Sequence, residues 1–469
     1  MKKILIALAM LLQTGIVLAQ IKFEKSYQDA LNLAGRKALP MLIYILPPSW
    51  PPIMPSGKPY VNGLEKPEVS DFYNKNFVAF KTFVGDTVAT RLIQQYQLTK
   101  YPAFIFTDSK GYLLSKGSSG MSFTQPYLDM ADEALAKLKS GKTLGGYEAE
   151  YQSGKRSGAF LKEFITYKMS LGLTDNAKLI EEYVRFLTVG DLDAYAEPLF
   201  ILKAGPYIYG KAYTLAYSNK KVIDSIYKTE PAAVLIAMTN AMRENTMNEA
   251  VRTKNATLAR NVYNFATSTN SKNPQAGYRL ASYTQVYYAR AVKDTASYMR
   301  YATNYYDQFF MGISADSINR MEKKLLAQRT KQVAADLEKN RAAYIAEYER
   351  NGHKVTKDSI VFRSGPISAP AVSSVAATLN NAAWDVYTLG IRNTNSLIKA
   401  LLWSRRAIEL SPSAGFYDTM AHIMYRLGFI DEALLNQDKA VALAVSAKQG
   451  QVDVDKLRNE ARLMKQRKL

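Results

Sequence analysis

Apolar and polar positions follow two different patterns along the chain. Up to about residue 139, short apolar runs typical of strands alternate with segments of helical spacing. The strand-like runs are Met41–Leu46, Phe77–Phe83, Ala103–Phe106 and Tyr112–Ser115. The helical segments are Phe23–Arg36, Glu68–Lys75, Val88–Tyr96 and Thr124–Leu138. Because Met41–Leu46 is apolar at every position, it predicts a strand that is buried on both faces. We therefore expect an α/β domain over residues 20–139.

From residue 147 onward the pattern is helical almost throughout. The predicted helical segments are Ala159–Leu171, Ala177–Leu187, Lys221–Ile236, Ala250–Ala266, Gln275–Ala291 and Thr295–Phe310. Met321–Arg350 is predicted to be a long charged helix. Residues 355–374 combine serine, proline and glycine with short apolar stretches, which favours a linker. The sequence therefore predicts helical hairpins over 147–354, a linker over 355–374 and a second helical domain over 375–469. The expected fold class is α/β plus all-α.

The first 19 residues have the pattern of a secretory signal peptide. Lys2 and Lys3 precede an apolar run from Ile4 to Leu12, and Val17 and Ala19 take the small-residue positions of a cleavage site. We expect cleavage after Ala19 and a periplasmic or secreted protein of bacterial type. An uncleaved membrane anchor is the alternative, although polar residues interrupt the apolar run after Leu12. No later stretch reaches about 18 apolar residues, so we expect no integral membrane protein.

The order of elements over residues 20–139 is similar to that of the secreted thioredoxin-like family. The stretches that carry the resemblance are RKALPMLIYILPPSW, PEVSDFYNKNFVAFKTFVGD and YQLTKYPAFIFTDSKGYLL. The resemblance implies a thioredoxin fold, with Trp50 before the position of a Cys-x-x-Cys pair and a cis-proline, Pro102 after Tyr101, facing it. The two cysteine positions fall on Pro51 and Met54, so the family's catalytic pair is missing.

The segment that replaces the catalytic pair is rich in proline, which opposes a helix beyond its first turn. We expect a stiff, irregular loop over residues 47–64. One interpretation is the decay of an unused site. The other is an apolar surface for an extended peptide that lies along the Pro102 edge. The candidate peptide-binding residues are Trp50, Ile53, Met54, Tyr60, Tyr101 and Pro102.

The last hundred residues resemble the tetratricopeptide repeat family. Trp384, Ala400, Ala407 and Pro412 match the large, small and proline positions of such a repeat, and Tyr417, Ala433 and Ala440 recur 33 residues after the first three. The resemblance implies hairpins whose helices approach closely at alanine. We expect Trp384 and Tyr417 to fill the gap to the next hairpin, and we expect Trp384 to support stability without contacting a ligand.

Tyrosine is dense in two neighbouring helical segments. The residues are Tyr278, Tyr283, Tyr287, Tyr288, Tyr298, Tyr301, Tyr305 and Tyr306. At helical spacing we favour an interface between stacked hairpins, and a wall for stacking sugars or peptides is the alternative.

Composition narrows the possible chemistry. The 469 residues include no cysteine and only two histidines, which excludes thiol redox chemistry by this chain and thiolate metal sites. The formal charge is +20, and +18 remains after the predicted signal peptide is removed. Nucleic acid is an unexpected partner for an exported protein, whereas an anionic envelope surface is a reasonable one.

These observations favour an exported, noncatalytic protein that binds a partner polypeptide through its thioredoxin-type groove and its helical repeats, such as a chaperone or assembly factor. We expect no cofactor, no metal and no catalytic residues. A thioredoxin-family redox protein is the alternative, but the absence of cysteine opposes it. A hydrolase is a further alternative, for which no pair of carboxylates stands out.

Overall fold

The computed structural model describes residues 20–47, 50, 62–120, 123–270, 273–339, 341, 345–346, 349, 373–447 and 451–469. The predicted signal peptide and nearly all of the predicted linker over 355–374 lie outside these residues. The chain forms two compact units. The first unit comprises Met1–Pro206, Lys211–Ala241 and Arg341–Val361, and the second comprises Tyr207–Gly210, Met242–Asn340 and Phe362–Leu469.

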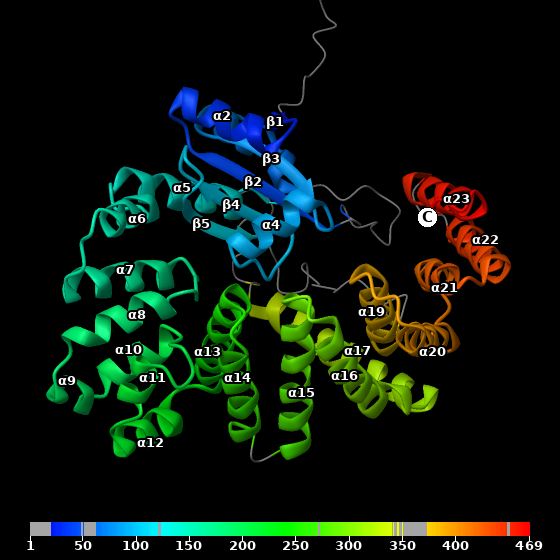
Figure 1. Cartoon of the computed structure of the whole chain (residues 1–469). Helices are drawn as coiled ribbons and strands as arrows, with labels where there is room; N and C mark the ends of the chain where they lie inside the picture. The colour runs from blue at the N-terminus through cyan, green and yellow to red at the C-terminus, as the bar shows by residue number, and fades with distance from the viewer. Residues whose placement is uncertain are drawn as a thin grey trace, which may run out of the picture. The chain divides into compact units, whose positions relative to one another are not determined.

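The first unit begins with a five-stranded mixed sheet. Its strands are β1 (Phe23–Glu24), β2 (Met41–Leu46), β3 (Val78–Phe83), β4 (Ala103–Thr107) and β5 (Leu113–Ser118). They lie in the order β1-β3-β2-β4-β5 (Figure 1). The first three strands of this order are parallel, and β4 and β5 are antiparallel to their neighbours. The register pairs Ala103 with Ile45 on one side and with Ser118 on the other.

Four helices accompany the sheet, with one short 3-10 turn. They are α2 (Tyr27–Lys37), α3 (Pro67–Asn76), α4 (Thr87–Gln95), α5 (Gln125–Lys139) and the 3-10 turn η1 (Gly63–Glu65). Every residue of β2 is buried, as its continuous apolar run predicts. On one face, Tyr44 stacks on Phe104 with ring centroids 4.6 Å apart, and Phe104 meets the edge of Tyr127 from α5. The predicted α/β start is confirmed, and its topology is consistent with a thioredoxin-like domain.

The predicted helix over Phe23–Arg36 is wrong in its first residues. Phe23 and Glu24 form an edge strand, because they pair in parallel with Ala79 and Phe80 of β3. The helix begins only after Ser26, whose side chain caps it by accepting a hydrogen bond from the Asp29 N–H at 3.1 Å.

Helices make up the rest of the first unit. They are α6 (Leu144–Gln152), α7 (Gly158–Ser170), α8 (Ala177–Tyr183), α9 (Val189–Asp193), α10 (Ala196–Lys203), α11 (Lys211–Ala216), α12 (Lys220–Thr229) and the 3-10 turn η2 (Val184–Phe186). The next helix, α13 (Ala232–Thr253), continues into the second unit. The predicted segment Lys221–Ile236 is therefore wrong in its bounds, because the helix breaks at Pro231 between α12 and α13. The predicted segment Ala250–Ala266 is likewise divided, between α13 and the helix that begins at Ala256.

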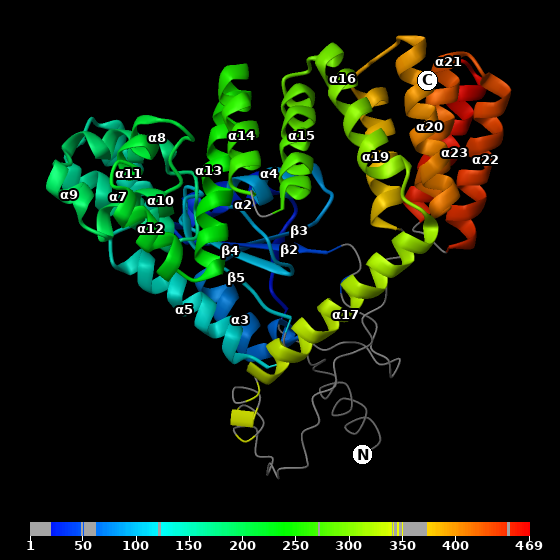
Figure 2. The same cartoon turned by 90° about the horizontal axis from the view of Figure 1, so that it is seen from below.

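The second unit is helical in the residues that the structure describes. After α13 it contains α14 (Ala256–Ser268), α15 (Pro274–Ala291), α16 (Thr295–Tyr306), the π-helical turn η3 (Asp307–Met311), α17 (Ala315–Lys339), α19 (Ser374–Thr388), α20 (Thr394–Leu410), α21 (Ala414–Leu427), α22 (Ile430–Ser446) and α23 (Gln451–Lys465). The five helices from α19 to α23 pack in sequence order (Figure 2). Among the described residues, no helix is both long enough and apolar enough to cross a membrane.

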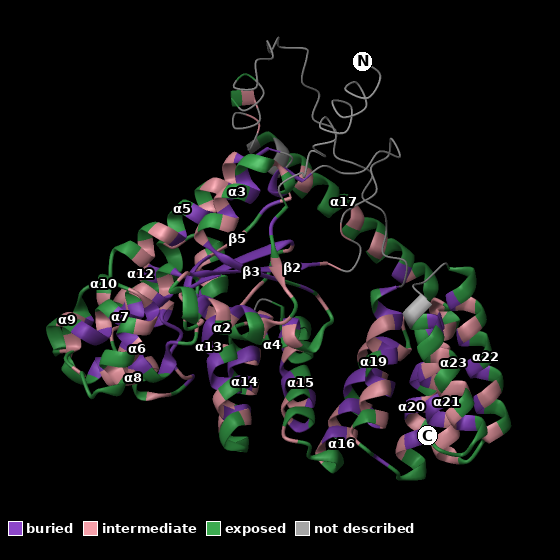
Figure 3. Cartoon of the chain, turned by 90° about the horizontal axis from the view of Figure 1, so that it is seen from above, coloured by how far each residue is buried: buried purple, intermediate pink, exposed green. Residues whose placement is uncertain are grey.

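Small residues lie where the helices of the last hairpins meet. Ala400, Ala407, Ala433 and Ala440 are all completely buried, which fits the close approach predicted for these positions. Buried positions lie on the sides of these helices that face their neighbours (Figure 3).

The two tryptophans of the last hairpins have different surroundings. Trp384 is half-buried and meets the next hairpin at His422, with ring centroids 5.3 Å apart, as predicted. The fully buried tryptophan is Trp403 on α20, which the sequence analysis did not single out. Its indole Nε1 donates a hydrogen bond to Asp307 Oδ1 at 2.9 Å, so its one polar group has a partner.

Candidate functional site

The Tyr101–Pro102 peptide bond at the start of β4 is cis. Pro102 has no N–H to donate and lies buried just before Ala103, the first residue of the strand. Tyr101 beside it is half-buried, and burial raises the pKa of its phenol. The cis-proline that the sequence resemblance implies is therefore present at the expected end of the sheet.

Trp50 lies at the same end of the sheet as Pro102. A Cβ atom added to Gly120 would lie 2.9 Å from Cη2 of the Trp50 ring, so the indole is close to the backbone there. Gly120 follows β5, whose Ser118 pairs with Ala103. The register thus brings Trp50, Tyr101 and Pro102 to one end of the sheet. The other predicted peptide-binding residues, Ile53, Met54 and Tyr60, lie outside the described residues.

A hollow of about 340 Å³ lies beside Trp50. Its lining residues are Gln20, Ile21, Phe23, Tyr44, Leu46, Trp50, Asn62, Leu64, Glu65, Lys81 and Phe83. Of these residues, only Trp50 is a predicted peptide-binding residue. The edge strand β1 supplies Phe23, and the ammonium group of Lys81 lies 5.1 Å from the centre of that ring. The lining thus combines apolar and aromatic side chains with polar and charged ones.

The second unit carries a larger hollow, of about 540 Å³. It is lined from α15, α16, η3 and α19 by Tyr283, Arg290, Tyr305, Tyr306, Phe310, Thr378, Asn381, Trp384 and Asp385. A neighbouring hollow of about 340 Å³ is lined from α13, α14 and α15 by Arg243, Glu244, Met247, Asn248, Val262, Leu280, Tyr283, Thr284 and Tyr287. Because Tyr283 lines both hollows, they adjoin, and we call them together the aromatic groove.

The tyrosine-rich segment divides between core and groove. Tyr298, Tyr305 and Tyr306 of α16 are buried, as the sequence analysis favoured. On α15, however, Tyr278, Tyr283 and Tyr287 are 44%, 44% and 40% exposed, so these three are not core residues. Tyr283 still contacts α16, because its ring centroid lies 5.5 Å from that of Tyr305. The buried positions of α15 are others, including Ala281 and Ala289. Four-residue spacing places Tyr283 and Tyr287 together on its remaining surface.

One ion pair crosses the aromatic groove. Arg290 Nε of α15 lies 2.7 Å from Asp385 Oδ2 of α19, and the Asp385 side chain is only 14% exposed. Burial raises the pKa of Asp385, and the nearby Arg290 guanidinium opposes that shift. At the other end of the groove, burial lowers the pKa of the Arg243 guanidinium. The lining thus combines aromatic rings with guanidinium, carboxylate, amide and hydroxyl groups.

These groups suit stacking and hydrogen bonding better than bond cleavage. Tyrosine and tryptophan provide large, stiff contact areas with one polar atom each, and Asn381 and Thr378 provide partners for peptide N–H and C=O groups. The sequence contained a signal for this surface, the tyrosine spacing, but spacing alone does not tell a core face from a solvent face.

Comparisons with known proteins give little information about this chain. No family model matches the chain, and no curated protein matches it. Among solved structures, one described as a DsbH oxidoreductase is similar at 18% identity and a TM-score of 0.22, over 26% of this chain and 89% of that chain. The thioredoxin-like description of the first unit therefore depends on the strand order and the cis-proline.

Proposed function

We propose that this protein is an exported, noncatalytic binding protein that holds an extended segment of a partner polypeptide, as a chaperone or assembly factor does. The observation that carries the proposal is the aromatic groove, where half-exposed aromatic side chains line adjoining hollows of about 540 and 340 Å³. In this proposal the hairpins of the second unit are tetratricopeptide-like, and the first unit is a thioredoxin-like domain without its catalytic pair.

The chemistry of the groove matches a polypeptide. An extended peptide presents side chains for stacking and a regular series of N–H and C=O groups for hydrogen bonds. Tyrosine, tryptophan and arginine are the side chains that most often dominate binding energy at protein interfaces. Tyr283 and Tyr287 of α15, Trp384 of α19 and Arg243 of α13 are of these types and line the groove.

The absence of cysteine supports the noncatalytic part of the proposal, because thiol–disulfide exchange needs a thiolate. The Trp50 hollow at the sheet end is proposed as a second contact for the partner. Its mixed aromatic and polar lining and the cis-proline edge suit an extended segment. The mature protein should not reduce insulin disulfides.

A permanently unfolded polypeptide provides the direct test. Fluorescently labelled, reduced and carboxymethylated lactalbumin would be titrated with the mature protein, and anisotropy would report binding. We expect Tyr283→Ala and Trp384→Ala each to weaken binding about 30-fold, which corresponds to a hot-spot loss of about 2 kcal/mol.

Phe429→Ala is the matched control, because Phe429 is an aromatic residue of the same unit, is 51% exposed and does not line the groove. Equal affinity of all four proteins would refute the groove as the binding site.

A further inference from the structure

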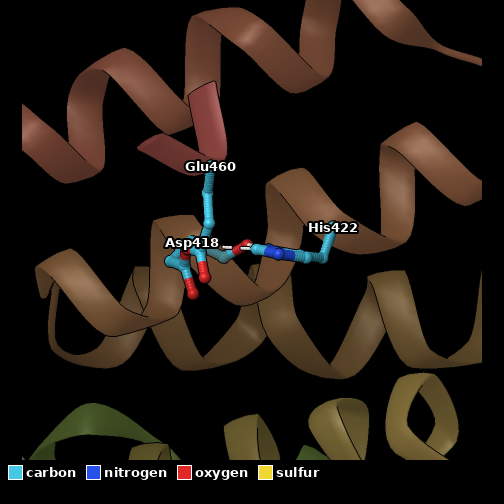
Figure 4. Close-up of side chains that lie close together, drawn as sticks. All are labelled: Asp418, His422 and Glu460. Carbon is cyan, nitrogen blue, oxygen red and sulfur yellow. Dashed lines mark hydrogen bonds and ion pairs between the residues drawn. The ribbon is translucent and has the colours of Figure 1, made fainter. Parts of the chain in front are cut away.

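Three potential metal ligands meet near the C-terminal end of the second unit. Asp418 and His422 are four residues apart on α21 and therefore share one face of that helix. Glu460 of α23 points toward them (Figure 4). Each residue offers one ligand atom, and these atoms all lie within 4.8 Å of one another. His422 Nδ1 is 3.6 Å from Asp418 Oδ1, so the imidazole and the carboxylate lie side by side.

A buried amide from a third helix adjoins this cluster. Gln437 of α22 is completely buried, and its Nε2 donates hydrogen bonds to Asp418 Oδ1 at 2.8 Å and to the Leu457 carbonyl at 3.2 Å. Its Oε1 has no hydrogen-bond partner among the described residues, and neither has the buried Oε2 of Glu460. Buried oxygen atoms usually have a partner, and a cation beside Glu460 would provide one for its Oε2.

The charges of the cluster also favour a cation. The ligand oxygens of Asp418 and Glu460 lie within 4.8 Å of each other. Two carboxylates at this separation repel each other when both are ionised, and a bound cation removes that penalty.

The histidine is positioned as metal-binding histidines commonly are. His422 is 3% exposed, and its Nδ1 lies 2.8 Å from the main-chain oxygen of Asp418. When Nδ1 donates its proton to that carbonyl, the other ring nitrogen keeps the lone pair that a metal needs. One imidazole with two carboxylates suits a divalent transition metal better than calcium or magnesium, which prefer oxygen ligands alone.

We propose that Asp418, His422 and Glu460 bind a divalent transition metal ion of the zinc type, which fastens α23 to α21. The site shares no residue with the aromatic groove. Its role is to stabilise the C-terminal helices of the second unit. Two of its ligands come from one helix and the third from another, so binding should be coupled to the docking of α23.

The test uses the tag-free mature protein after treatment with a chelator and dialysis. Calorimetric titration with Zn²⁺ should show one site, and at free Zn²⁺ about 100 times the dissociation constant the unfolding midpoint should rise by about 5–10 °C. Glu460→Gln keeps the size of the side chain and removes the charged ligand, and His422→Ala removes the imidazole. Each should weaken Zn²⁺ binding at least tenfold and abolish the rise in the midpoint.

His353→Ala, which replaces the only other histidine, is the matched control and should bind Zn²⁺ as the parent protein does. The proposal is overturned if the parent protein shows no Zn²⁺ binding, or if Glu460→Gln and His422→Ala bind Zn²⁺ unchanged.

Discussion

At the residue scale, the two tryptophans of the last hairpins serve different purposes. Trp403 is fully buried and meets Tyr306 edge to face, with ring centroids 5.2 Å apart. Trp384 is half-buried, stacks on Tyr387 and lines the aromatic groove. The sequence pattern predicts the stabilising role for Trp384, but the deeper burial of Trp403 gives the larger part of it to Trp403.

Trp403→Ala should therefore lower the free energy of unfolding by about 3–5 kcal/mol, because it opens a large cavity and leaves Asp307 without its indole partner. Trp384→Ala should cost less than half as much. Urea denaturation of the two variants beside the parent protein measures both values. Equal losses would show that Trp384 is a core residue.

Asp86 provides a pH-dependent contribution to stability. Its Oδ2 accepts hydrogen bonds from Thr82 Oγ1 at 2.7 Å and from the Phe83 N–H at 3.0 Å, and these bonds hold the pKa of Asp86 below its usual value. A lowered pKa in the folded state means that the contribution is present above the unfolded pKa of about 3.9 and is lost as the pH falls through the folded pKa.

Asp86→Asn should accordingly cost about 0.5–1 kcal/mol at pH 7, because the side chain is exposed and its charged hydrogen bonds are partly screened. The difference from the parent protein should shrink toward zero near pH 2. Urea titrations at both pH values test this, and a difference that does not change with pH would contradict it.

At the element scale, regular patterns were sufficient to predict most helices and strands. The run of six apolar residues predicts the buried strand β2, and apolar residues at helical spacing predict α7 and α15. The edge strand β1 was missed because two residues are too short to show a period, and their pairing with β3 depends on contacts more than 50 residues apart.

The candidate sites were harder to predict than the elements. The groove combines residues of helices that are distant in sequence, and only folding places Tyr283 beside Trp384. The Asp418 and His422 pair had a visible four-residue spacing, but Glu460 lies 42 residues from Asp418 on another helix, so no sequence motif links the three.

The last helix, α23, is held by its own apolar contacts. Met464 is completely buried and packs with Ala421 of α21 and Ala433 of α22. Met464→Ala should destabilise the chain by about 2–4 kcal/mol and should expose α23 to proteases. Limited proteolysis followed by mass spectrometry checks this. Arg458→Ala, which removes an exposed side chain of the same helix, should leave the cleavage rate unchanged.

At the scale of the whole molecule, the proposal combines export, a sheet without a catalytic pair and a helical unit with a binding groove. The mature chain keeps a formal charge of +18 once the predicted signal peptide is removed, which favours acidic partners or an anionic envelope surface. Export, the missing cysteine pair and the groove are compatible with one another, because a protein that only binds its partner needs no reactive thiol.

Export makes a simple prediction about the N-terminus. The protein recovered from the cell envelope or the medium should begin at Gln20, since Val17 and Ala19 provide the cleavage site. N-terminal mass spectrometry of the native protein would show this. Recovery of the protein from the cytoplasm with Met1 intact would contradict export.

Photo-crosslinking in living cells tests the central claim, that the aromatic groove holds a polypeptide, most directly. p-Benzoylphenylalanine in place of Tyr287, which is 40% exposed in the groove, would be compared with the same residue in place of Phe429, which is 51% exposed outside it. The account predicts crosslinked polypeptide from position 287, reduced by the additional change Trp384→Ala, and little from position 429. Crosslinks of equal yield at both positions, or none at position 287, would contradict it.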